Sequence, residues 1–226
     1  MSSFRVRRAP FRSARAGAGA TEVATAMESP TATVSILVLD ASGTPRRWIG
    51  IEDAVGYYYK EQVAWDLGRH AFTLHGGTSR ATGLRSMLTL RSIVAVRGDA
   101  SRRARFHPVP ALTREMLFAR DRFVCAYCGG RFRHSELTCE HVKPQSRGGR
   151  DTWTNLVSAC KPCNLRKGDR TPEQARMPLL YVPYVPNLHE AFILRNRRIL
   201  ADQMEFLMAG VPRHSRLHEE ERVLPA

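Results

Sequence analysis

The sequence predicts an α+β protein with three successive folded parts: a small α+β module, a central domain organised by paired cysteines, and a long C-terminal helix. Three observations predict this class. Val34, Ile36 and Val38 show the apolar pattern of a buried strand, two Cys-x-x-Cys pairs bracket the middle of the chain, and apolar residues recur at helical spacing near the C-terminus. With 226 residues, 43% of them hydrophobic, the chain can build a folded core, which excludes a wholly disordered protein.

The first hundred residues divide into a tail and a module. Residues 1–32 are rich in Arg, Ala, Ser and Gly, lack periodicity, and predict a disordered basic tail. A transit peptide and a true start at Met27 are the two alternative interpretations of this tail. Residues 33–100 predict the N-terminal α+β module. Its expected elements are a helix over 51–62 and strands over 34–38, 63–67, 71–74 and 87–96.

Helix-capping residues organise the rest of the chain. After a basic, proline-containing linker at 101–112, Thr113 caps the first helix of a domain over 113–176, and Thr171 caps a short helix at its end. The last part, 177–226, predicts an extended segment and then a long helix that Asn187 caps. The apolar stripe of that helix either packs on its own chain, which we favour, or forms an oligomer contact.

The chain is strongly basic, and its charge is concentrated. The formal net charge is +14, with an isoelectric point near 10.4, and residues 101–170 hold 15 basic against 6 acidic side chains. Such a local excess indicates a polyanion partner, most simply nucleic acid, although a merely solubilising surface is the alternative. No run of about 18 apolar residues exists, which excludes an integral membrane protein. Without a signal-peptide core, the expected location is the cytoplasm, where cysteines stay reduced.

Four of the five cysteines form a metal-ligand pattern. Cys125 and Cys128 make one Cys-x-x-Cys pair, Cys160 and Cys163 make the other, and 31 residues separate the pairs. A two-residue gap lets both thiolates of a pair face one ion, and four thiolates close a tetrahedral shell, so we expect a structural Zn²⁺. The fifth, Cys139, is expected to be a small buried apolar side chain.

The insert between the cysteine pairs carries a family resemblance. It contains Glu140-His141 with Pro144 three residues after His141, the Ser-x-Gly-Gly sequence of 146–149, and Asn155-Leu before the second pair. An Asn-x-x-Lys sequence, Asn164 to Lys167, follows the second pair. This pattern resembles the HNH endonucleases, whose ββα-metal site lies between two zinc knuckles, and it covers residues 113–176. Residues 33–100 are also similar to the small module that precedes this domain in bacterial and phage members.

The resemblance assigns roles to individual residues. His141 is the expected general base, because a group with a pKa near neutrality can deprotonate water. Glu140 and Asn164 are expected to hold one divalent ion, Mg²⁺ or Mn²⁺, on the opposite face of the strand from His141. Asn155 is expected to fix the loop and orient His141. The expected phosphate contacts are Lys143, Arg147, Arg150, Arg166 and Lys167.

Two residues depart from the usual family pattern. Glu140 stands where most relatives carry Asp, and Asn164 replaces the final His. The leading hypothesis is a metal-dependent endonuclease that hydrolyses DNA, with RNA as an alternative substrate. The other hypothesis is a zinc-stabilised module that binds nucleic acid with little or no catalysis. Dependence on a divalent ion distinguishes them, because simple binding needs only the basic surface.

Overall fold

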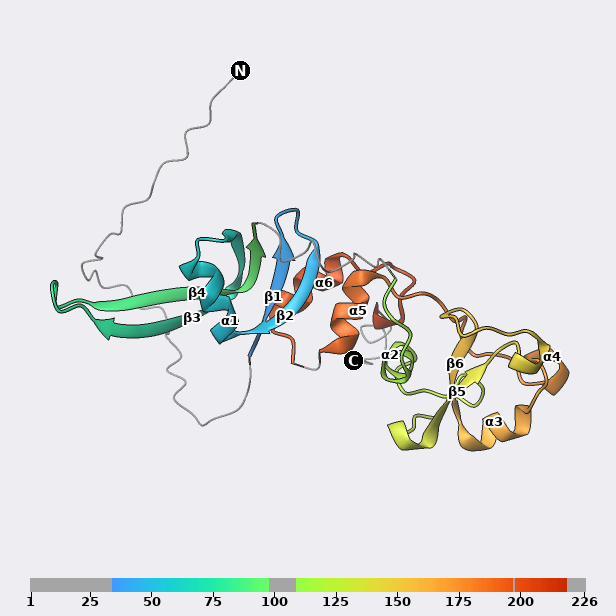
Figure 1. Ribbon diagram of the computed structural model, residues 1–226. Helices are drawn as coiled ribbons and strands as arrows, with labels where there is room; N and C mark the ends of the chain where they lie inside the picture. Colours follow the sequence, from blue (N-terminus) through green and yellow to red (C-terminus); the bar gives the residue numbers. More distant parts are fainter. Residues whose placement is uncertain (1–33, 98–108, 197, 219–226) are drawn as a thin grey trace, which may run out of the picture. The chain divides into compact units, whose positions relative to one another are not determined.

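The computed structural model describes residues 34–97, 109–196 and 198–218, and its mixed α+β class is as predicted (Figure 1). The predicted tail at 1–32 and most of the predicted linker at 101–112 lie outside the described residues. Within the described ranges, no helix is both long and apolar enough to cross a membrane.

The N-terminal module is a four-stranded sheet with one helix. Its strands lie in the order β2-β1-β4-β3, with β1 and β4 parallel and the other neighbours antiparallel. Strand β2 was not predicted, because its sequence PRRWIG has no apolar alternation. The bounds are β1 Ser35–Asp40, β2 Pro45–Gly50, α1 Ile51–Tyr59, β3 Val63–Thr78 and β4 Arg85–Val96.

Alternate residues of the sheet feed two separate cores. Ile36 and Val38 of β1, with Val94 of β4, face α1. Leu37 and Leu39, in contrast, pack against the two C-terminal helices on the other face. The C-terminal apolar side chains therefore cover a sheet of their own chain, and Figure 1 shows these helices beside β1 and β2.

The single long helix predicted from Asn187 is wrong, because the described residues form two shorter helices, α5 Leu188–Arg195 and α6 Ala201–Ala209. Asn187 does cap the first, accepting a hydrogen bond of 2.8 Å from the Glu190 backbone N–H. The cause of the break lies in Gln203 of α6.

Gln203 starts the second helix and fastens it to the sheet. Its side-chain oxygen accepts from the Leu200 backbone N–H at 3.0 Å. This bond satisfies one of the amides at the start of the helix that have no partner within the helix. Its amide nitrogen donates to the backbone oxygens of Ser35 and Ser92, both at 2.8 Å. Because the Leu200 N–H is bound by Gln203, it does not donate to the Asn196 oxygen as a continuous helix would require, and α6 begins as a separate helix.

The central domain has the ββα arrangement. Strands β5 and β6 form an antiparallel pair, with Leu137 opposite Cys160 and His141 opposite Leu156, and α3 follows β6 directly. Thr113 caps α2 as predicted, since its hydroxyl accepts from the Met116 N–H. The bounds are α2 Arg114–Arg120, η1 His134–Glu136, β5 Leu137–His141, η2 Gln145–Arg147, β6 Leu156–Cys160, α3 Lys161–Lys167 and α4 Pro172–Ala175.

A buried ion pair connects α2 to the ββα unit. Arg120 is 1% exposed and Asp121 is fully buried, and the Arg120 Nε lies 2.8 Å from Asp121 Oδ1. The remaining guanidinium donors bond the backbone oxygens of Trp153, Leu156 and Tyr184. Because the buried guanidinium has a hydrogen-bond partner for each of its nitrogens, the pair can hold β6 in place.

Candidate functional site

The four predicted cysteines come together in one cluster. Their Sγ atoms all lie within 4.8 Å of one another, and the Sγ atoms of Cys128 and Cys160 are 3.9 Å apart. A tetrahedral zinc with Zn–S bonds of about 2.3 Å places its sulfurs roughly 3.8 Å from each other. The donor type, number and spacing therefore fit zinc.

Local backbone geometry builds each half of this cluster. The Cys125 N–H bonds the Gly130 oxygen at 2.9 Å, and Gly129, with φ of 74°, donates back to the Cys125 oxygen at 3.0 Å. This tight turn needs the left-handed conformation that glycine adopts at low cost. Cys160 ends β6 and Cys163 sits in the first turn of α3, so the strand-to-helix junction aligns the second pair.

The thiols of the cluster show why a cation is needed there. Burial raises the pKa of Cys160 and Cys163, and the neighbouring Cys125 raises both further. Burial also opposes ionisation of Cys125, yet hydrogen bonds from backbone N–H groups outweigh it and lower its pKa. Several thiolates cannot share this volume without a compensating positive charge, which a zinc ion supplies.

His141 lies at the end of β5 and is paired with a carboxylate that the sequence analysis missed. Its Nε2 is 2.6 Å from Oδ1 of Asp151, to which Gln145 also donates at 3.2 Å. These two hydrogen bonds lower the pKa of Asp151. Because an ionised carboxylate only accepts, Nε2 carries the proton of a neutral His141, and Nδ1 is left to accept another.

The His141 side chain borders a hollow of roughly 260 Å³. The side chain is 20% exposed, so the ring is held but reachable. Cys139, on the same face of β5, is exposed rather than buried as predicted, because it borders the hollow instead of the packed core. The hollow is lined by Leu112, Thr113, Arg114, Leu117, Cys139, His141, Gln145, Asp151 and Leu156.

Asn155 closes the loop that carries Asp151. Its amide nitrogen donates to the backbone oxygens of Lys143 and Arg150, at 3.2 Å and 3.0 Å, and its side-chain oxygen accepts from the Lys143 N–H at 2.8 Å. The same loop requires Gly149, since a Cβ there would lie 1.8 Å from the Lys143 oxygen. The contacts of Asn155 thus hold the segment that directly follows His141.

The opposite face of β5 carries Glu140, which lies in a different environment. Glu140 is 8% exposed, and its Oε1 accepts from the Nζ of Lys167 at 2.5 Å. The Lys167 ammonium also bonds the His141 backbone oxygen at 2.8 Å. Asn164, one turn earlier on α3, donates to the Thr138 hydroxyl at 2.8 Å. Glu140 and Asn164 therefore face the same side of the ββα unit, as two oxygen-bearing side chains.

Lys167 corrects one prediction. We expected it to contact phosphate, but its side chain is fully buried, because the buried Glu140 needs a counter-charge. The other four predicted phosphate contacts have exposed side chains: Lys143, Arg147, Arg150 and Arg166. Arg147 in addition bonds the Asp169 backbone oxygen at 2.9 Å, which ties the Gly-Gly loop to the end of α3.

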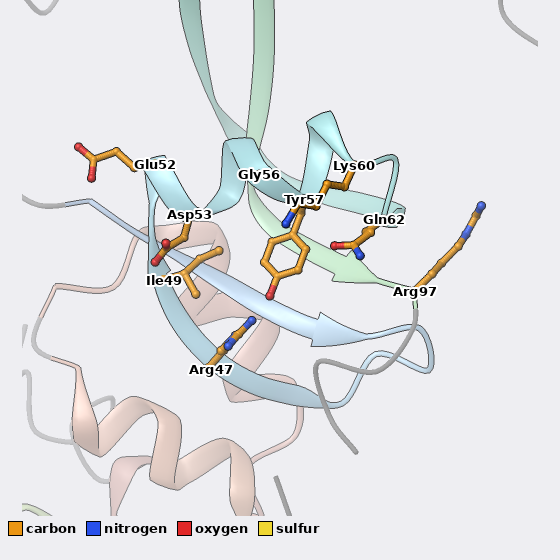
Figure 2. Close-up of a pocket in the computed structure, with 9 residues that line it drawn as sticks. All are labelled: Arg47, Ile49, Glu52, Asp53, Gly56, Tyr57, Lys60, Gln62 and Arg97. Atoms are coloured by element: carbon orange, nitrogen blue, oxygen red, sulfur yellow. The ribbon is translucent and has the colours of Figure 1, made fainter. Parts of the chain in front are cut away.

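A second, larger hollow lies apart from these residues. It measures roughly 700 Å³, and Figure 2 shows Arg47 of β2 and Tyr57 of α1 pointing into it. The Arg47 guanidinium carbon lies 5.6 Å from the centre of the Tyr57 ring. Its lining mixes three cationic side chains with Glu52 and Asp53, and no predicted site residue reaches it. It contributes nothing to the site around His141.

Comparison with known proteins agrees with this geometry. The fold and the site together are those of a small ββα domain joined to a cluster of four cysteines. Residues 125–180 match the family model of the HNH endonucleases, which covers about a quarter of the chain. The resemblance predicted from the sequence motifs is thereby confirmed for this segment, and it supports a nuclease-type function in general. No curated protein matches the chain.

Proposed function

We propose that this protein is a metal-dependent endonuclease that hydrolyses phosphodiester bonds of DNA. The observation that carries the proposal is the His141–Asp151 pair beside an open hollow, within the segment that matches the HNH endonucleases. A carboxylate that holds one imidazole nitrogen fixes the tautomer and stabilises the imidazolium that forms. The basic side chains around the site suit a polyanionic substrate.

In the proposed reaction His141 Nδ1 takes a proton from water. The water oxygen bonds to phosphorus and the bond to the 3′ oxygen breaks. That oxygen takes a proton from solvent and leaves as a hydroxyl, and the phosphate stays on the 5′ side. Asp151 holds the ring while it is charged. Lys143, Arg147 and Arg150 lie on the same loop as Asp151 and neutralise the phosphates of the bound strand.

Glu140 and Asn164 are the residues that would hold the divalent cation, Mg²⁺ or Mn²⁺. The cation supplies Lewis-acid stabilisation of the phosphate and the leaving oxygen. Carboxylate and carboxamide oxygens suit these ions, and the two side chains share one face of the domain. Lys167 takes one of the two carboxylate oxygens, Oε1, so the cation has to share Glu140 with an ammonium or displace it.

That shared carboxylate also favours a second candidate function. A module whose Glu140 charge is already compensated by Lys167 has less need of a cation. In this alternative the zinc-stabilised domain binds nucleic acid and hydrolyses it slowly or not at all. Binding then depends on salt but not on Mg²⁺ or Mn²⁺.

Cleavage of supercoiled plasmid tests the proposal. Zinc-loaded full-length protein is incubated without added divalent ion, with Mg²⁺ and with Mn²⁺, beside His141→Ala. The control is His134→Ala, which changes a histidine of the same domain outside the hollow beside His141. We expect nicking that needs the divalent ion and is lost only in His141→Ala. Folded protein that binds DNA but cleaves in neither ion supports the binding module, and an RNA of matched length examines the alternative substrate.

A further inference from the structure

Strands β3 and β4 continue far past the sheet as a two-stranded ribbon. Strand β4 pairs with β1 only over Ile93–Val96, whereas it pairs with β3 out to Arg85. We define the ribbon as residues 71–91, from the pair Ala71–Arg91 to the connecting turn and back. Figure 1 shows it extending from the sheet without a helix over its far end.

The ribbon has one apolar and one open face. Phe72 and Leu74, opposite Leu90 and Leu88, lie on the face that joins the core under α1. The other face carries exposed side chains in three cross-strand pairs, Ala71–Arg91, Thr73–Thr89 and His75–Met87. A sheet bulge lies at the base of the ribbon, between Leu67 and Ala71.

The charge of the ribbon has a single sign. No Asp or Glu occurs anywhere from Leu67 to Arg97, although these residues include five arginines and two histidines. Three of the arginines, Arg80, Arg85 and Arg91, belong to the ribbon and are exposed. An exposed surface with cations and no anions attracts a polyanion.

The dimensions of the ribbon select among polyanions. Two paired strands are about 5 Å apart and roughly 10 Å wide with their side chains, and the major groove of B-DNA is about 12 Å wide. Eight residues of strand at about 3.3 Å each span roughly 26 Å, or about three quarters of one turn of the duplex. The major groove of double-stranded RNA is too narrow and deep for such an element.

We propose that the ribbon lies in the major groove of duplex DNA, where Arg80, Arg85 and Arg91 contact phosphates on the two sides of the groove. The proposal rests on the function proposed above for its choice of DNA. It gives the N-terminal module a role in holding the substrate while the central domain acts on it.

The test compares two triple variants of the full-length chain. Arg80→Gln/Arg85→Gln/Arg91→Gln removes the ribbon charges, and Lys60→Gln/Arg198→Gln/Arg213→Gln removes three exposed charges elsewhere. Both are made on His141→Ala, so that binding is measured without cleavage. Thermal unfolding shows that each variant is folded. Affinity for a 20-base-pair duplex, and for double-stranded RNA of the same sequence, is then measured across a salt series.

We expect the ribbon variant to lose affinity for DNA, on the order of 10- to 100-fold at physiological salt, and the slope of log affinity against log salt to fall by up to about 2.7. The control variant and the RNA affinity change much less. Equal losses in the two variants overturn the ribbon proposal, as does an unchanged DNA affinity of the ribbon variant. If the folded, zinc-loaded parent protein binds no DNA, the result contradicts the proposed function itself. If the parent binds DNA and the ribbon variant binds it equally well, only the ribbon proposal is wrong.

Discussion

Replacing Lys167 by Met tests the central feature of the domain, the buried pair with Glu140. Lys167 is fully buried and Glu140 is 8% exposed, so the variant leaves a carboxylate with little water and no counter-charge. Loss of one partner of a buried pair costs about 3–5 kcal/mol. The hydrogen bond to the His141 oxygen is lost as well. We expect Lys167→Met to lose this amount of unfolding free energy at pH 7.

Two companion measurements attribute the loss to the pair. Glu140→Gln/Lys167→Met removes the stranded charge, so it should be more stable than Lys167→Met alone by about 1–3 kcal/mol. Divalent ions should also stabilise Lys167→Met more than the parent, because a cation at Glu140 then replaces the missing ammonium. Saturation to a hundred times the dissociation constant gives about 2.7 kcal/mol.

The assay is urea unfolding at constant free zinc, followed by circular dichroism, with and without Mn²⁺. A loss under about 1 kcal/mol in Lys167→Met refutes the reasoning, because the carboxylate would then reach water. A double variant no more stable than the single one refutes it too, since the cost would come from packing. If Mn²⁺ stabilises the parent and Lys167→Met equally, Glu140 is not the site where the ion binds.

Three other changes have expected outcomes. Asp151→Asn should lower plasmid cleavage by about 100-fold or more with unchanged unfolding, because the ring loses the group that fixes its tautomer; equal cleavage rates contradict this. Cys163→Ser should reduce bound zinc, measured by mass spectrometry, and unfold the central domain. Burial opposes ionisation of Asp202, but hydrogen bonds from His70 and Ser92 outweigh it and lower its pKa to about 2. The stabilisation that ionised Asp202 gives the folded protein is complete above the unfolded pKa of about 4 and is lost as pH falls towards 2. Asp202→Asn should therefore lower the free energy of unfolding by about 2 kcal/mol at pH 7, and this loss should shrink on acidification.

The features that the sequence predicted correctly depend on residues that lie close together in the chain. Thr113, Thr171 and Asn187 accept hydrogen bonds from amides three residues later, and all three helices begin where these caps stand. The cysteine pairs are equally local, because a two-residue gap brings two thiols to one point. Their convergence into one cluster followed from the chemistry of zinc rather than from any long-range pattern.

Long-range partners were the part that the sequence could not supply. Asp151 stands ten residues from His141, and only the course of the loop brings them together. Lys167 and Glu140 are 27 residues apart and meet because α3 packs across β5. Gln203, at the start of α6, likewise bonds Ser35 and Ser92 of the N-terminal sheet, which lie more than a hundred residues earlier in the chain. Without knowledge of that packing, the basic residues at the end of α3 were interpreted as phosphate contacts.

The strand that carries both Glu140 and His141 joins the two halves of the proposed chemistry. Alternation puts the base on one face, beside Asp151, and the carboxylate on the other, beside Asn164 and Lys167. Lys167 bonds the carboxylate of one residue and the backbone oxygen of the next, so any change in how Glu140 is compensated acts on the backbone that positions the base. A cation that takes Glu140 from Lys167 would thus affect His141 without touching its ring. On this view the longer side chain of Glu140 matters because it reaches a lysine as well as an ion.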